Sequence, residues 1–227
     1  VDEPDFVKND GKYIYLIADR ALVVIDAYPA EQARIVSTTP FMDSPVEIFL
    51  DGDRLVVFTN GNDEQFIKPA GSIAPVPTWR QVTKALVFDV SDRNAPALER
   101  TITMTGSYYD SRMIGDYVYS ITTEAVDYSF NDPNVPMVKE GDDREITPDV
   151  YYFDMIYPYY LYQTITSFNI HDTAAPSAES FLVGSATTLY SSPSNMYIAY
   201  QRTIPPQRWN EMRPALQEQI APPGYNQ

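Results

Sequence analysis

Val87-Phe88-Asp89 is followed 26 residues later by Gly115, and Gly115 opens the stretch Tyr117-Val118-Tyr119. Two other pairs share this spacing of 26 residues: Asp26 with Gly52, and Asn169 with Asn195. The distance from one such unit to the next varies widely. A constant unit interrupted by segments of variable length is typical of a radial or stacked repeat fold.

Each unit contains up to four segments in which apolar and β-branched residues alternate with the period of two typical of strands. The first strands are predicted at 13–17, 55–58, 118–121 and 197–200, and the second strands at 22–26, 85–89 and 165–169. The third strands are predicted at 34–38, 98–104 and 179–183, and the fourth strands at 46–50, 109–114 and 188–191.

The connections between these strands repeat as well. Gly11, Gly52 and Gly115 stand between a fourth strand and the next first strand, where a tight turn favours a residue that accepts positive φ. Asp92–Pro96 and Asp172–Pro176 give the same Asp-x-x-Ala-Pro turn between second and third strands. The long variable segments always fall between the first and second strands, at about 59–83, about 122–163 and from about 201 onward.

Four-stranded antiparallel units repeated about a centre predict an all-β fold, a β-propeller whose inserts all emerge on one face. We expect about three blades and the first strand of a fourth, hence an incomplete ring. The predicted divisions are 11–51, 52–114 and 115–194 for the blades, 195–227 for the start of the fourth, and 1–10 for the outer strand of a ring-closing blade. The apolar spacing of 206–220 predicts a short or broken helix.

Composition excludes several classes of protein. The net charge is −15, so binding to nucleic acid, which requires a Lys/Arg surface, is not expected. The absence of cysteine excludes disulfides, thiolate zinc sites and cysteine nucleophiles. No apolar run is long enough to span a bilayer, so no transmembrane segment is predicted. The single histidine, His171, is interpreted as a plain turn residue because it has no second His or Cys for a zinc cluster.

The insert at 122–163 carries most of the candidate binding chemistry. It is rich in acidic residues and tyrosines, and exposed aromatic rings can stack on sugars or anchor a protein partner. The candidate binding residues are Trp79, Tyr151, Tyr152, Tyr157 and Tyr159. Asp142, Asp143 and Glu145 are candidate calcium ligands, although their spacing is not that of an EF-hand. The alternative is that the acids only solvate a long loop and the tyrosines pack it against the sheets. No catalytic residue or other cofactor is predicted.

The opening stretch, Val1 to Tyr15, closely resembles that of secreted prokaryotic proteins with a C-terminal β-propeller domain, distantly related to WD40 repeats. The stretches 24–29, 52–58 and 195–200 fit the same family. The resemblance implies an exported or cell-surface protein of archaea or bacteria and supplies no catalytic motif. Members of that family are longer, so we expect the remaining blades, or another chain, to cover the open edges.

These observations favour a non-enzymatic extracytoplasmic propeller that presents an aromatic and acidic loop face to a protein or glycan. Two alternatives remain open at the level of sequence. One is a hydrolase or lyase that acts on polysaccharide through a pair of carboxyl groups. The other is a purely structural module of the cell envelope. Convergent carboxyl groups in a pocket would favour the enzyme, and an exposed patch of aromatic rings would favour the binding module.

Overall fold

A computed structural model of the chain describes residues 1–67, 76–127, 134–141, 144–152, 159–184, 186–192 and 195–200. Within these residues the regular structure is strand, apart from the short 3₁₀ helix η1 (Ala30–Gln32). The prediction of an all-β fold is therefore confirmed for the part that the structure describes. The helix predicted at 206–220 lies outside the described residues.

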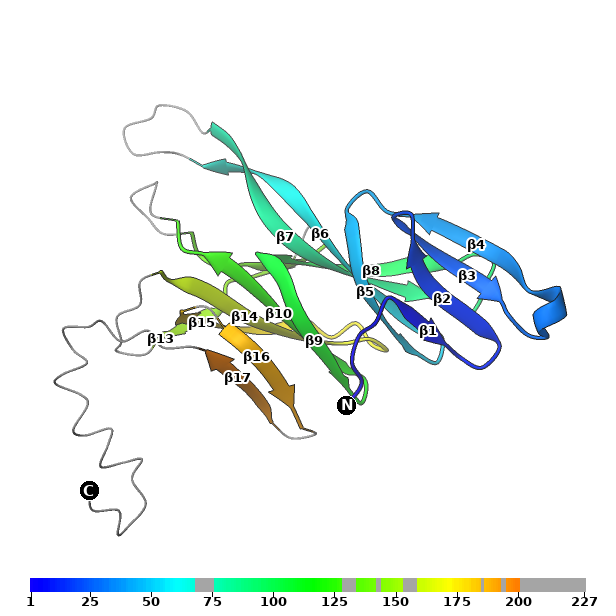
Figure 1. Ribbon diagram of the computed structural model, residues 1–227. Helices are drawn as coiled ribbons and strands as arrows, with labels where there is room; N and C mark the ends of the chain where they lie inside the picture. Colours follow the sequence, from blue (N-terminus) through cyan, green and yellow to red (C-terminus); the bar gives the residue numbers. More distant parts are fainter. Residues whose placement is uncertain are drawn as a thin grey trace, which may run out of the picture.

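Three sheets, antiparallel except for one short parallel pair at the edge of the third, account for most of the molecule (Figure 1). Sheet 1 has the order β1-β2-β3-β4, with β1 (Val7–Asn9), β2 (Tyr13–Ala18), β3 (Ala21–Asp26) and β4 (Arg34–Pro40). Sheet 2 is built on β5 (Ser44–Asp51), β6 (Arg54–Ile67), β7 (Val76–Asp89) and β8 (Ala97–Thr105). Sheet 3 is built on β9 (Ser107–Ile114), β10 (Tyr117–Ala125), β14 (Leu161–Asn169) and β15 (Ser177–Val183). A separate hairpin follows, made of β16 (Ala186–Ser191) and β17 (Met196–Tyr200).

The sheets are offset by one strand from the blades expected from the sequence. Asp51 pairs with Arg54, and Ile114 with Tyr117, so each glycine turn lies inside a sheet rather than between two sheets. A two-residue turn joins neighbouring antiparallel strands, which explains why the fourth strand of one unit pairs with the first strand of the next. For the same reason β1, expected in a ring-closing blade, pairs with β2 in sheet 1. The three turn glycines, Gly11, Gly52 and Gly115, do adopt positive φ.

Sheet 2 is buried on both faces. Along β6, Leu55 and Val57 join a hydrophobic cluster shared with sheet 1, whereas Val56 and Phe58 join a cluster shared with sheet 3. Side chains alternate between the two faces of a strand, so the continuous apolar run of β6 serves both interfaces. The sheets therefore stack face to face, as successive blades do.

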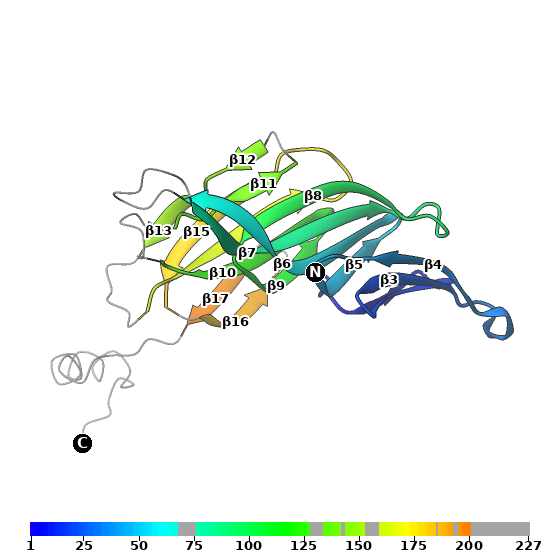
Figure 2. The same cartoon turned by 90° about the horizontal axis from the view of Figure 1, so that it is seen from above.

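The N-terminal segment ties the three sheets together along one edge. Asp5 exchanges two backbone hydrogen bonds with Ile48 of β5, and Asp2 exchanges two with Met113 of β9. Lys8 donates to the Asp2 carboxylate at 2.9 and 3.0 Å. Figure 2 shows the N-terminus lying where β5 and β9 approach each other.

The segment between β10 and β14 contributes strands to two different sheets. β11 (Val138–Glu140) pairs with β8 and with β12 (Arg144–Ile146), which extends sheet 2. β13 (Asp149–Tyr152) pairs in parallel with β15, at the edge of sheet 3. The insert therefore links two neighbouring sheets at their outer edges.

Candidate functional site

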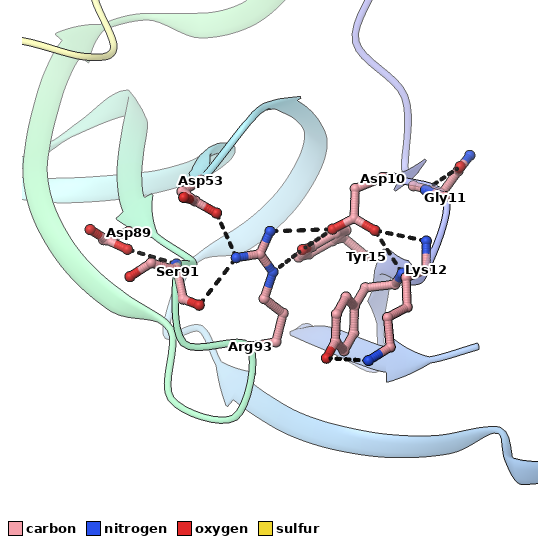
Figure 3. A network of polar contacts seen from close by, with 10 residues as sticks. Asp10, Gly11, Lys12, Tyr15, Asp53, Asp89, Ser91 and Arg93 are labelled. Carbon is pink, nitrogen blue, oxygen red and sulfur yellow. Dashed lines mark hydrogen bonds and ion pairs between the residues drawn. The ribbon is translucent and has the colours of Figure 1, made fainter. Parts of the chain in front are cut away.

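One polar network lies where the turns of sheet 1 and sheet 2 meet (Figure 3). Arg93, in the β7–β8 turn, donates to Asp53 at 2.5 Å, to Tyr15 Oη at 2.9 Å and to Asp10 at 3.3 Å. Tyr15 in turn donates to Asp10 Oδ2 at 2.9 Å. Asp10 comes from the β1–β2 turn and Asp53 from the β5–β6 turn, so one guanidinium joins the turns of two sheets.

The network shifts the pKa of each of its central members. Burial raises the pKa of the Asp10 carboxyl. Hydrogen bonds from the backbone N–H groups of Tyr13 and Lys12, and from the side chains of Tyr15 and Arg93, together lower this pKa by a larger amount, so the net shift is downward. Burial and the neighbouring Asp10 raise the pKa of Tyr15 to about 12. Burial lowers the pKa of Arg93, but its bonds to Asp53, Tyr15 and Asp10 outweigh that effect and raise it. The charged carboxylate–guanidinium state is thus strongly favoured.

The corresponding turns of sheet 2 and sheet 3 bring together Asp51, Asp116 and His171. His171 Nε2 lies 2.8 Å from Asp51 Oδ2. One possible ligand atom from each of the three side chains lies within 4.8 Å of the others. Asp51 is half-buried, while Asp116 and His171 are exposed. Two carboxylates and an imidazole are a set of groups that a metal ion can bind.

The loop that carries His171 is held in place by an arginine of the neighbouring sheet. Arg100 of β8 donates to the backbone oxygens of Asn169, Asp172 and Ala174 at 2.5–3.1 Å. Its Nε also donates to Glu140 at 2.7 Å, and its side chain is 8% exposed. The position of the His171 loop relative to sheet 2 is therefore fixed by a buried cation.

Four of the five predicted aromatic binding residues are exposed. The exposed fractions are 69% for Trp79, 49% for Tyr151, 73% for Tyr152 and 83% for Tyr159. Tyr157 lies outside the described residues. Tyr151 and Tyr152 belong to β13, and Tyr159 precedes β14, so these three come from one insert, while Trp79 comes from β7.

The predicted calcium ligands remain untested. Glu145 is exposed on β12, opposite Lys139 of β11. Asp142 and Asp143 lie outside the described residues. Calcium at this position stays a prediction.

With the geometry in place, comparison with known proteins identifies the family. A model of the family described as "Beta propeller domain" matches residues 1–221. The chain belongs to the beta propeller domain family. An uncharacterised protein of Methanocaldococcus jannaschii is 23% identical over 209 residues, which cover 90% of this chain and 28% of that protein. This propeller chain thus spans about a quarter of the length of the curated relative that it matches. No solved structure matches it.

Sequence reasoning missed the cluster of Asp51, Asp116 and His171 in this propeller chain. His171 was interpreted as an isolated turn residue because no second His or Cys accompanies it. The signal was nevertheless in the repeat: Asp51 stands directly before a turn glycine and Asp116 directly after one. Because blades stack, turns of consecutive blades must meet, and side chains at these fixed positions converge even when they are far apart in sequence.

The carboxyl groups of the propeller chain give the hydrolase alternative little support. A pocket of about 380 Å³ contains Glu99 and Glu140, but Glu140 is paired with Arg100 and Arg144, and Glu99 with Arg54. Three carboxyl groups of the described residues, Asp10, Asp89 and Asp92, have a shifted pKa, and each shift is downward. A general acid requires the opposite shift. In the described part of the chain, no helix is both long and apolar enough to cross a bilayer.

Proposed function

We propose that this propeller is a non-enzymatic, extracytoplasmic binding module that presents its insert side to a protein or glycan partner. The observation that carries the proposal is the exposure of Trp79, Tyr151, Tyr152 and Tyr159. A Trp or Tyr ring that remains in water forgoes burial worth about 1.5–3 kcal/mol, so several such rings on insert segments need an explanation beyond folding. Binding to a partner supplies one.

Two features make the tyrosines of β13 suitable for recognition. Tyr151 is stacked on Phe181 of β15, with ring centroids 5.6 Å apart, which limits the conformational entropy that binding would cost. β13 is also the edge strand of sheet 3, and all four of its residues are exposed. In the part of the chain that the structure describes, β13 pairs with β15 alone, so a partner can contact both the rings and the backbone along the outer side of this strand.

The two other functions fit these observations less well. A purely structural module would bury the aromatic rings of its insert under neighbouring segments, yet Tyr152 and Tyr159 are largely exposed. A polysaccharide hydrolase would need two free carboxyl groups facing a pocket, one of them with a raised pKa. Both glutamates of the pocket at β8 and β11 are ion-paired.

The binding proposal is tested with the full-length protein on glycan arrays and against purified surface proteins of the source organism, with and without Ca²⁺. For any ligand found, Tyr152→Ala and Tyr159→Ala should each weaken binding about tenfold, the effect expected of an anchoring aromatic. Tyr28→Ala is the matched control because Tyr28 is 72% exposed in the loop between β3 and η1, outside the long inserts. Equal affinity of all three variants and the wild type would contradict a role for the insert rings.

A further inference from the structure

The two interfaces between the three sheets are constructed in the same way. Asp89 Oδ1 accepts the Ser91 N–H at 2.7 Å in the β7–β8 turn, and Asn169 Oδ1 accepts the His171 N–H at 2.7 Å in the β14–β15 turn. Asp92 and Asp172 likewise accept the N–H two residues ahead, at 3.0 and 2.8 Å. Ser91 therefore corresponds to His171, and Arg93 corresponds to Thr173.

The acidic residues that face these turns also correspond. The Val90 N–H donates to the Asp53 backbone oxygen at 2.9 Å, and the Ile170 N–H donates to that of Asp116 at 3.0 Å. Asp53 and Asp116 both follow a turn glycine, and Asp10 and Asp51 both precede one. At each interface, the aspartate that precedes a turn glycine of one sheet therefore lies near the aspartate that follows the turn glycine of the next sheet.

The interfaces differ in the cation that compensates for these aspartates. At the first interface the Arg93 guanidinium binds both Asp10 and Asp53. At the second interface the corresponding residue, Thr173, has no charge. Among the described residues, no lysine or arginine forms an ion pair with Asp51 or Asp116, and Asp51 contacts the His171 imidazole instead. The second pair of aspartates therefore has the position of the first pair but not its guanidinium.

We propose that Asp51, Asp116 and His171 bind a divalent metal ion of the zinc class, which replaces at this interface the cation that Arg93 supplies at the other. Zn²⁺ accepts His nitrogen and Asp oxygen ligands at about 2.0–2.2 Å. His171 Nε2 and Asp51 Oδ2 are hydrogen-bonded at 2.8 Å in the metal-free chain. Two ligands of a tetrahedral Zn²⁺ ion lie about 3.3 Å apart, so the ion would replace this hydrogen bond after the two atoms separate slightly. The limit of 4.8 Å for all three atoms means that only a small side-chain movement is needed to complete the set.

The choice of metal follows from the ligands. Ca²⁺ takes six to eight oxygen ligands, and Mg²⁺ retains most of its water, so neither gains from an imidazole. Zn²⁺ binds three protein ligands and leaves a fourth position for water or for a group from a partner. Because the His171 and Asp116 side chains are exposed, that fourth position faces solvent.

The metal would join sheet 2 to sheet 3. Asp51 belongs to β5 in sheet 2, while Asp116 and His171 belong to turns of sheet 3. The His171 loop is already held by Arg100, so a large part of the ordering needed for metal binding is complete before the ion arrives. Binding to the folded state alone must raise the stability of the chain.

The experiment is a titration of the metal-free chain with Zn²⁺ alone, followed by calorimetry, thermal unfolding and NMR of the imidazole. His171 is the only histidine, so its ring signals can be assigned without ambiguity. We expect these signals to shift on addition of one equivalent of Zn²⁺ and the unfolding temperature to rise. His171→Ala and Asp116→Asn should each weaken Zn²⁺ binding about 10- to 100-fold.

Two further variants make the result specific. Thr173→Arg places a guanidinium at the position equivalent to Arg93, so it should remove Zn²⁺ binding while the metal-free variant stays folded by circular dichroism. Glu145→Gln, in the candidate calcium segment, is the carboxylate control and should leave Zn²⁺ affinity unchanged. Three outcomes would each overturn the proposal. The Zn²⁺ affinity could depend on Glu145 but not on Asp116, or the His171 signals could stay unshifted on addition of Zn²⁺. The third outcome is that Ca²⁺ binds more tightly than Zn²⁺ at these residues. None of these outcomes bears on the aromatic surface, which is tested with separate variants.

Discussion

At the residue scale, the charges of this acidic chain are organised by a few arginines placed between sheets. Arg93 joins the turns of sheets 1 and 2, and Arg100 joins β8 to the loop that follows β14. The side chains of Arg93 and Arg100 are 18% and 8% exposed, so their bonds are only weakly screened by solvent. Hydrogen bonds to partly buried charged groups contribute about 1.5–3 kcal/mol, so Arg93→Ala should lower the free energy of unfolding by about 2 kcal/mol, as measured by denaturant titration.

The network around Asp10 also predicts a pH dependence at this scale. The folded state lowers the pKa of Asp10 below its ordinary value of 3.8, so below about pH 5 the unfolded chain binds more protons than the folded chain does. The stability contributed by Asp10 is therefore present near neutral pH and is lost as the pH falls through its folded pKa. Asp10→Asn should flatten the dependence of unfolding free energy on pH between about 5 and 2.5.

Tyr15→Phe is the matched control for Asp10→Asn. It removes the hydroxyl that bonds to Asp10 and Arg93 but retains the titrating carboxyl group. Its pH profile should fall between those of the wild type and Asp10→Asn, because Tyr15 supplies only part of the downward shift. An Asp10→Asn profile parallel to that of the wild type would show that this network does not govern acid stability.

At the element scale, the sequence predicts the strands more reliably than it predicts their grouping into sheets. The alternating pattern and the glycine turns place the strands around Gly52 and Gly115 correctly, because both signals are local. The boundary between sheets depends on the connection from the third strand to the fourth, and no long or distinctive segment marks it. Gly106 makes that connection between β8 and β9 in a single residue. The pairing of β11 with β8 could not be predicted either, since it depends on contacts distant in sequence.

Gly106 supplies a prediction at this scale. It adopts φ +94°, and a Cβ atom there would lie 2.6 Å from the Thr123 backbone oxygen. Gly106→Ala therefore combines an unfavourable backbone conformation with a backbone clash, and should lower the free energy of unfolding by about 3 kcal/mol or more. Gly115→Ala is the control, because Gly115 also has positive φ but no atom within 4 Å of the added Cβ, so its cost should be about 1–2 kcal/mol. Equal costs for the two variants, measured by denaturant unfolding, would mean that the close approach of Thr123 is relieved by a backbone shift.

At the scale of the whole molecule, the two faces of sheet 1 differ in what covers them. Tyr15, Leu22 and Val24 are buried against sheet 2. On the other face, a continuous apolar surface is left partly or largely exposed, and cross-strand pairs connect its members: Val7 with Leu16, Leu16 with Val23, Ile14 with Ile25, and Ile25 with Ile35. An apolar sheet face of this kind is typical of a surface that another element covers. In a propeller that element is the next blade.

This face predicts that the 227-residue chain self-associates in solution, since a second copy can cover the surface that a neighbouring blade would cover in a ring. Ile14 and Ile25 are cross-strand partners on this face. The double variant Ile14→Thr/Ile25→Thr makes the surface more polar, so it should shift the chain toward the monomer in sedimentation equilibrium. Val135→Thr, an exposed position of the β10–β14 insert, is the control and should leave the association unchanged. A chain that is monomeric at high concentration, with both isoleucines in place, would mean that the exposed apolar face is tolerated without a partner.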